Sequence, residues 1–221
     1  MMFLGNVTES LPLTNGLELV TAQKARVRIQ TVHDGIFRVW LHPDGAPFPA
    51  EPFSYALCPE SLEEPPPSIQ IEQTAAHLRL KQGSWNVLIQ RNPLRLWFEG
   101  PDGVPLAADS FGMAWEGERI SVWKKQADGE KTGPFERTGR AFVHWNTDDS
   151  GYDAQDDPLY KTFPFYLALC PTSKGHFLSY GIFFDNTYRS WFDFGGQAPG
   201  HVSFGAEGGE LVYYFLAGPT P

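Results

Sequence analysis

Cysteine is nearly absent from this chain of 221 residues. The two cysteines, Cys58 and Cys170, lie far apart, and no C-x-x-C pair occurs. Two cysteines cannot build a disulfide framework, and this spacing gives no support for a zinc site. We therefore expect both thiols to be buried apolar groups and predict no metal and no cofactor.

Long apolar runs are also missing. No stretch of about 18 apolar residues occurs, which is the length a membrane-spanning helix needs. The start of the chain, Met1 to Asn6, has neither a basic segment nor a long apolar run. The sequence therefore predicts no signal peptide, no membrane partner and a cytoplasmic location.

Positive charge is scarce. The chain has 17 Lys and Arg against 26 Asp and Glu, which gives a net charge of −9. Nucleic acids and anionic membranes need clustered basic side chains, so we expect neither as a partner. An acidic surface of this kind is compatible with neutral ligands such as sugars.

The chain is rich in aromatic residues, glycine and proline, and its periodicity is that of strands. Arg26 to Gln30 alternates polar and apolar residues, and Asp34-Gly35 separates it from Ile36 to Leu41, which predicts a hairpin. No window carries a convincing helical stripe, and Ala107 to Trp115 is expected to hold one short helical turn at most. Further predicted strands are 68–73, 77–81, 85–90, 94–99, 119–123, 142–145, 165–170, 177–184, 188–194 and 211–216.

These short strands, separated by turn residues, predict an all-β fold. We expect two antiparallel sheets packed face to face as a β-sandwich, with residues 1–221 forming a single domain. The proline-rich segment Pro43 to Pro67 is expected to be an exposed connection or an edge. Two polar loops, Lys124 to Gly139 and Thr147 to Pro158, flank the strand near residue 142, and long loops on a rigid sheet often carry binding residues.

The densest polar cluster is Trp145 to Pro158. It combines an aromatic ring with amide, carboxylate and hydroxyl groups, which are the groups that bind sugar rings and their hydroxyls; we select Trp145, Asn146, Asp148 and Ser150. A solvated acidic turn, in which Asp and Asn bond to the local backbone, explains the same composition more simply. A calcium site is a minor alternative, although the spacing does not match the usual calcium-binding loop.

Catalytic carboxylates are not evident. Asp148 and Asp149 are adjacent, so on an extended chain they point to opposite faces and are poorly placed to act on one glycosidic bond. The sequence therefore predicts no catalytic residue in this chain.

A series of short segments in the second half forms a recognisable pattern. The segments are Gly129–Pro134, Arg137–Arg140, Trp145–Asp148, Asp157–Lys161, Pro164–Tyr166, Gly181–Ser190, Gly205–Leu211, Tyr213–Phe215 and Gly218–Pro221. In this order they resemble the N-terminal domain of family 31 glycoside hydrolases, of the α-glucosidase type. Residues 1–128 resemble that domain mainly in their short strands and their aromatic-rich sandwich pattern. One departure is Ala127-Asp128, where the family usually has Gly-Leu.

The resemblance implies a sandwich of the galactose-mutarotase-like type, also called a supersandwich. In the family, a (β/α)8 barrel with two catalytic aspartates follows this domain and hydrolyses α-linked glucosides with retention. The chain would then be a non-catalytic N-terminal domain, truncated before its downstream barrel partner and inactive alone. By position, Asp148 would accept hydrogen bonds from an α-glucoside in the acceptor-side subsite, and Ser150 would replace a threonine-type hydroxyl.

Two other functions fit the same sequence. A freestanding carbohydrate-binding module would need a complete sugar platform, and a mutarotase-like aldose epimerase would need a His and Glu pair that the sequence does not single out. If the first interpretation holds, the face that docks the barrel should be apolar and exposed, and we expect it to drive homodimer formation.

Overall fold

The computed structural model describes residues 1–49, 54, 68–125, 138–153, 156–171 and 177–218. Within these ranges the regular structure is β-strand, apart from a single 3-10 turn, η2 (Pro101–Gly103). The same residues include no helix that is long and apolar enough to cross a membrane. The predicted all-β class is confirmed.

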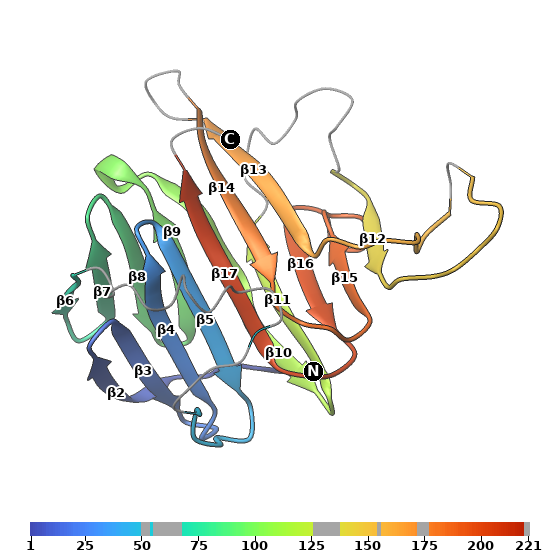
Figure 1. Cartoon of the computed structure of the whole chain (residues 1–221). Helices are drawn as coiled ribbons and strands as arrows, with labels where there is room; N and C mark the ends of the chain where they lie inside the picture. The colour runs from blue at the N-terminus through green and yellow to red at the C-terminus, as the bar shows by residue number, and fades with distance from the viewer. Residues whose placement is uncertain (50–53, 55–67, 126–137, 154–155, 172–176, 219–221) are drawn as a thin grey trace.

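The described strands form two sheets in which neighbouring strands run antiparallel (Figure 1). The first, called the ten-stranded sheet, includes one strand, β1 (Met2–Phe3), that pairs with β10 off the main path. Across the sheet the order is β12 (Ala141–His144), β15 (Ser190–Asp193), β16 (His201–Ala206), β11 (Arg119–Lys125), β10 (Pro105–Glu116), β9 (Leu94–Glu99), β8 (Trp85–Arg91), β7 (His77–Gln82) and β6 (Gln70–Gln73).

The second, called the seven-stranded sheet, lies against the first. Its order is β13 (Phe165–Pro171), β14 (Phe177–Phe184), β17 (Leu211–Gly218), β5 (Ile36–His42), β4 (Arg26–His33), β3 (Gly16–Thr21) and β2 (Val7–Leu13). The Asp34-Gly35 hairpin is confirmed, because His33 pairs with Ile36 across it and Gly35 adopts the positive φ of 69° that such a turn needs.

The main core lies between the sheets, where the inward residues of each strand are buried. Phe98 of β9 stacks on Phe215 of β17 with ring centroids 4.3 Å apart, and Phe37 of β5 packs 6.2 Å from Phe98. These rings come from opposite sheets, so they join the two layers directly. Full burial of such a side chain stabilises the fold by about 1.5–3 kcal/mol.

Strand β10 was not predicted. Ala107 to Trp115, expected to hold one short helical turn at most, contains none and belongs to a twelve-residue strand. Its register shifts between Asp109 and Gly112, where two extra residues are inserted opposite β11. This bulge breaks the alternation of apolar residues, which is why the sequence did not read as a strand.

Lys124 corrects one prediction. It was placed at the start of a polar loop, but it lies in β11 and is 1% exposed. Its Nζ donates to Asp109 Oδ1 at 2.8 Å and lies 5.1 Å from the ring centres of Phe98 and Tyr213. A lysine can remain charged inside the core only with such a partner. Residues 126–137 of that loop, including the Gly129–Pro134 segment, lie outside the described residues.

The proline-rich segment only partly fits its prediction as an exposed connection. Phe48 is buried on the outer face of the seven-stranded sheet, with its ring 5.0 Å from Trp40 and 4.4 Å from the Arg28 guanidinium. Pro47 and Pro49 beside it are exposed, and residues 50–53 and 55–67, which include Cys58, lie outside the described residues. Cys170 is buried as predicted, with Sγ 3.3 Å from the Leu106 carbonyl oxygen.

Candidate functional site

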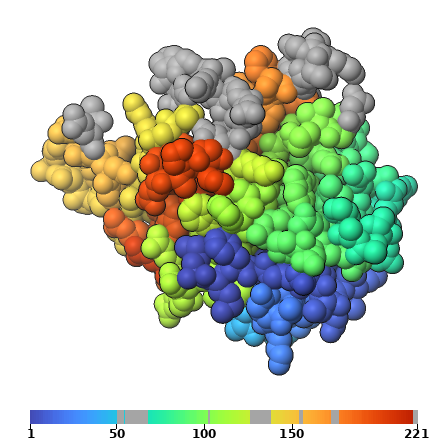
Figure 2. All heavy atoms as spheres, turned by 180° about the vertical axis from the view of Figure 1, so that it is seen from behind, coloured from blue at the N-terminus to red at the C-terminus, as the bar shows by residue number. Residues whose placement is uncertain are grey.

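The main candidate site is a long connection between the two sheets. Residues 145–153 and 156–164, here called the arm, leave edge strand β12 of the ten-stranded sheet and return to edge strand β13 of the seven-stranded sheet. Figures 1 and 2 show the arm extending beyond the body of the sandwich. It therefore presents its side chains outside the core.

Hydrogen bonds within the arm fix its shape. Thr147 donates its backbone N–H to Leu159 at 3.1 Å and its hydroxyl to Pro158 at 3.0 Å, which joins the outgoing and returning segments. The Tyr152 hydroxyl donates to the Thr147 carbonyl and accepts the Asp149 N–H at 3.1 Å. The Asp157 carboxylate accepts the Val143 N–H at 2.9 Å and so ties the arm to β12.

The four predicted sugar-binding residues are all exposed on this arm. Trp145 is 44% exposed, and Asn146 accepts a hydrogen bond from the Thr162 hydroxyl at 3.0 Å. Trp145 and Asn146 line a cavity at the root of the arm. Asp148 and Ser150 are exposed further along the arm and do not line that cavity. The structure therefore brings Trp145 and Asn146 together at the root of the arm and separates them from Asp148 and Ser150.

Part of the arm is also a simple polar turn. Asp149 Oδ1 accepts the Gly151 N–H at 3.2 Å, which is the local side-chain bond of an Asx-type turn. The Asp149 side chain is therefore used by the turn, as the alternative of a solvated acidic turn expects.

Trp145 and Asn146 line a cavity of about 500 Å³, here called the Trp145 hollow. Its opposite wall is the connection between β14 and β15, which supplies Asp185, Asn186 and Tyr188. The sequence analysis did not select these three residues. The signal that could have found them is their position in the Gly181–Ser190 segment, where a polar group directly follows an apolar strand.

Asp185 is the carboxyl group of the Trp145 hollow. Burial raises its pKa above the ordinary value, and this effect exceeds the opposing effects of a hydrogen bond with Ser54 and of the Arg38 charge. Asn186, by contrast, has a structural role, because its amide donates to the Gly208 and Glu210 carbonyls at 3.0 and 2.9 Å. Asp185 and the exposed Thr187 are further polar side chains that this connection contributes to the lining.

Tyr188 is held in place by two glycines. A Cβ atom at Gly208 or Gly209 would lie 2.9 or 2.7 Å from the Tyr188 ring, and Gly209 has a φ of 80°. The ring therefore lies directly on this backbone, although Tyr188 is 52% exposed. The hollow thus has an aromatic residue on each side, Trp145 and Tyr188.

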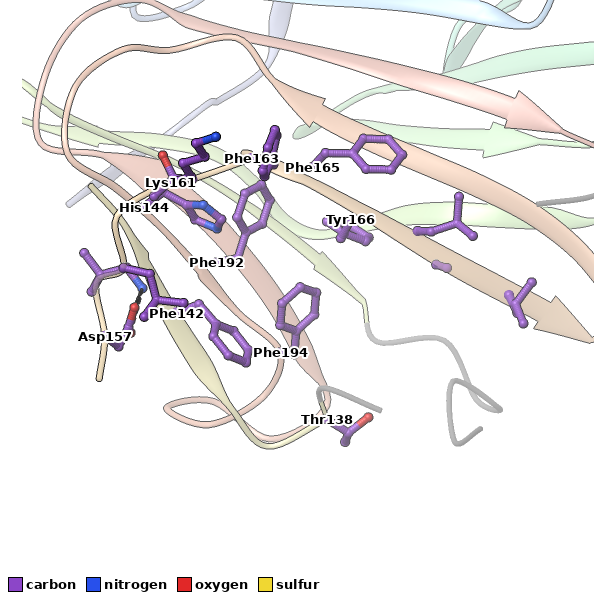
Figure 3. Close-up of a pocket in the computed structure, with 16 residues that line it drawn as sticks. Thr138, Phe142, His144, Asp157, Lys161, Phe163, Phe165, Tyr166, Phe192 and Phe194 are labelled. Atoms are coloured by element: carbon purple, nitrogen blue, oxygen red, sulfur yellow. Dashed lines mark hydrogen bonds between the residues drawn. The ribbon is translucent and has the colours of Figure 1, made fainter. Parts of the chain in front are cut away.

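A second cavity, of about 610 Å³, opens between the edge strands β12 and β13 and is called the Phe192 hollow (Figure 3). Phe192 and Phe194 form its floor, and the Tyr166 ring contacts both at centroid distances of 5.6 and 5.3 Å. The lining is therefore mainly apolar, with several aromatic rings, in contrast to the mixed lining of the Trp145 hollow.

The described residues contain no group of three or more His, Cys, Asp or Glu side chains that could hold a metal ion. They offer aromatic faces, amides and single carboxylates, which are groups for binding a ligand. The fitting chemistry is recognition of a polar, hydroxyl-bearing molecule at the arm.

Comparisons with known proteins place this geometry in context. The family model described as the glycosyl hydrolase 31 N-terminal galactose mutarotase-like domain matches residues 26–193. Alpha-glucosidase 2 of Bacillus thermoamyloliquefaciens is 32% identical over 206 residues, which cover 88% of this chain and 25% of that protein. Alpha-xylosidase XylQ of Lactiplantibacillus pentosus is 36% identical over 93 residues, covering 42% of this chain and 11% of that protein.

Solved structures agree with these relatives. The GH31 dextranase of Flavobacterium johnsoniae, complexed with isomaltotriose, has a TM-score of 0.82 and 27% identity, and the match covers 99% of this chain and 27% of that chain. A GH31 alpha-xylosidase from a soil metagenome shares the fold, with a TM-score of 0.70 and 14% identity over 97% of this chain and 33% of that chain. The chain thus spans about a quarter of alpha-glucosidase 2 and of the dextranase, and the predicted sandwich type is confirmed.

Proposed function

Because the chain belongs to the glycosyl hydrolase 31 N-terminal galactose mutarotase-like domain family, we propose that it is the non-catalytic N-terminal domain of a retaining α-glucosidase-type enzyme. The relatives include an α-glucosidase, an α-xylosidase and a dextranase, and the longest curated match is to the α-glucosidase. The observation that carries the proposal is the arm, which presents exposed sugar-binding groups on a bonded frame outside the sandwich.

The arm contributes to the acceptor-side subsite. Asp148 accepts hydrogen bonds from sugar hydroxyls, and Ser150 offers a hydroxyl beside it. Both side chains are exposed, so neither is packed in the core of the sandwich. Trp145 covers the C–H face of a ring, and Asn146 adds an amide at the root.

A downstream catalytic domain supplies the reaction. The chain matches 25% of alpha-glucosidase 2 and 27% of the dextranase, so most of each relative lies outside the matched stretch. Retaining hydrolysis needs two carboxyl groups about 5–5.5 Å apart on either side of the bond, and the proposal assigns both to that domain.

Assay of the 221-residue chain with p-nitrophenyl α-glucoside tests this assignment. We expect no release of p-nitrophenol by the chain alone and release by the polypeptide that continues it into the catalytic domain. Turnover by the chain alone would refute the non-catalytic role.

The Trp145 hollow favours a second candidate, a freestanding carbohydrate-binding module. It has aromatic residues on both sides and Asp185 in its wall, all within this chain. Titration calorimetry of the chain with maltose separates the two functions. Binding below millimolar concentration would favour the module, whereas the domain role predicts no such binding.

A further inference from the structure

The most exposed of the large apolar side chains among the described residues is Phe163, at 74%. It lies at the end of the arm, two residues before β13. Leu159, Phe165 and Leu167, which line the Phe192 hollow together with it, are each exposed by 44–50%. Four neighbouring apolar side chains facing water form a patch that soluble proteins usually cover.

Three hollows meet at this point. The Phe192 hollow is lined by Phe163 and Phe165, and so is a third cavity of about 610 Å³, here called the Leu216 hollow. The Trp145 hollow and the Leu216 hollow share Pro164 and Phe183. The segment 162–165 therefore separates three adjoining hollows, which together form one continuous uneven surface.

The Leu216 hollow lies on the outer face of the seven-stranded sheet. Phe165, Phe183 and Tyr214 face each other across β13, β14 and β17, and the Phe183 and Tyr214 rings stack at 5.9 Å. The remaining lining is almost wholly apolar and includes Ile36 and Leu216. An outward sheet face normally carries polar side chains, so this half of the face departs from the rule.

The other half of the same face obeys the rule. On β3 and β4, Glu18 pairs with Arg28 at 2.7 Å and also with Arg26. The apolar surface is therefore centred on β13, β14 and β17 and reaches the ends of β4 and β5 at Val32 and Ile36.

The apolar surface is also pre-organised. A Cβ atom at Gly181 would lie 2.6 Å from the Phe165 ring, so that ring rests flat on the β14 backbone. A ring held in this way loses little side-chain entropy when a partner covers it, which favours tight association.

We infer that this surface, defined as Phe163, Phe165, Leu167, Phe183 and Leu216, is where the downstream catalytic domain docks. The inference rests on the proposed function. Two observations favour this occupant: the relatives carry about three quarters of their length outside the matched stretch, and β17, which contributes Leu216, ends at Gly218 on this same sheet. A domain that follows β17 would begin beside the hollows.

The test uses the polypeptide that continues this chain into the catalytic domain, with a protease site inserted after Gly218. After cleavage, gel filtration shows whether the two parts stay together, and surface plasmon resonance gives their dissociation constant. We expect the cleaved parts to co-elute. Phe163→Asp and Leu167→Asp should each raise the dissociation constant by about 30-fold or more, as for an interfacial hot spot. Both side chains are exposed, so neither change should disturb folding.

The matched control is Phe111→Asp. Phe111 is 45% exposed, but it lies in β10 of the ten-stranded sheet. It should leave the dissociation constant unchanged. Separation of the unsubstituted parts, or equal effects of Phe111→Asp and Phe163→Asp, would overturn the assignment. The 221-residue chain could instead form a dimer that Phe163→Asp abolishes, while the same change has no effect on the cleaved parts. That result would assign the surface to contact with a second copy of the chain.

Hydrolysis of p-nitrophenyl α-glucoside by the uncut polypeptide is measured in parallel. An inactive polypeptide whose parts nevertheless co-elute would refute the proposed function and leave the docking surface intact. An active polypeptide whose parts separate both with and without the Phe163→Asp change would refute the docking surface and leave the proposed function intact.

Discussion

At the scale of single residues, Glu18 shows how a charge is held on the outer face. Its carboxylate is almost fully buried and accepts from Arg28 and Arg26 on the next strand. Burial alone would raise its pKa, but the bonds to both arginines outweigh that effect and hold the pKa below its ordinary value. Glu18 is therefore ionised in the folded protein and joins β3 to β4.

We predict that Glu18→Gln lowers the free energy of unfolding by about 1–3 kcal/mol at pH 7, because it weakens charge-assisted hydrogen bonds. A lowered pKa contributes stability above the unfolded value, here 4.5, and this contribution is lost as pH falls through the folded value. The difference from the wild type should therefore shrink in acid. Urea denaturation at pH 7 and pH 3 measures it.

Glu72→Gln is the control for this prediction. Glu72 pairs with Lys81, but its side chain is 55% exposed, so the loss should stay below about 1 kcal/mol. An effect of Glu18→Gln that is as small as this, or that grows toward low pH, would contradict the account.

The residues of the candidate site were only partly predictable. Trp145 and Asn146 were selected as members of a polar cluster, and the structure places both in the lining of a hollow. Asp185 and Tyr188, about 40 residues later, reach the same hollow only because β15 pairs with β12. Such pairing between distant segments is a property of topology, so local composition does not reveal it.

At the scale of the strands, a buried ion pair in the core joins β10 to β11. Lys124 Nζ donates to Asp109 Oδ1, while Asp109 Oδ2 accepts the Leu96 N–H of β9 at 2.9 Å. The Tyr213 hydroxyl of β17 lies 3.5 Å from the same ammonium. Burial raises the pKa of Tyr213 well above its ordinary range, so this hydroxyl stays protonated.

We predict that Lys124→Met destabilises the fold by about 3–5 kcal/mol, because it leaves the Asp109 carboxylate buried without its cation. The double variant Lys124→Met with Asp109→Leu should recover much of that loss, since neither charge of the pair remains. Chemical denaturation of the two single variants and the double variant measures the coupling. If the double variant were as unstable as the sum of the single variants, the pair would not act as a unit.

Strands with strict alternation and clear turns were predictable from the sequence, and β4 and β5 are examples. Strand β10 was not, because its bulge between Asp109 and Gly112 interrupts the period of two. Lys124 was mistaken for a loop residue, because its charge is compatible with the core only through a partner 15 residues away. Strands with an irregular register and buried charges with distant partners thus cannot be predicted from the periodicity of the sequence.

At the scale of the whole molecule, the sandwich is a scaffold with two outward features. The arm presents Asp148 and Ser150, and the apolar surface around Phe163 lies at the root of the same arm. If a catalytic domain docks on that surface, as we propose, the arm lies beside that domain.

The most direct test of the central claim is the kinetics of Asp148→Ala in the polypeptide that contains the catalytic domain. Asp153→Ala is the matched control, since Asp153 is an exposed carboxylate on the same arm. Loss of a charged hydrogen bond to the sugar should lower kcat/KM for maltose by about tenfold to a hundredfold for Asp148→Ala. The control should leave it unchanged. Equal kcat/KM values for Asp148→Ala and the wild type would contradict the claim that this domain shapes the acceptor-side subsite.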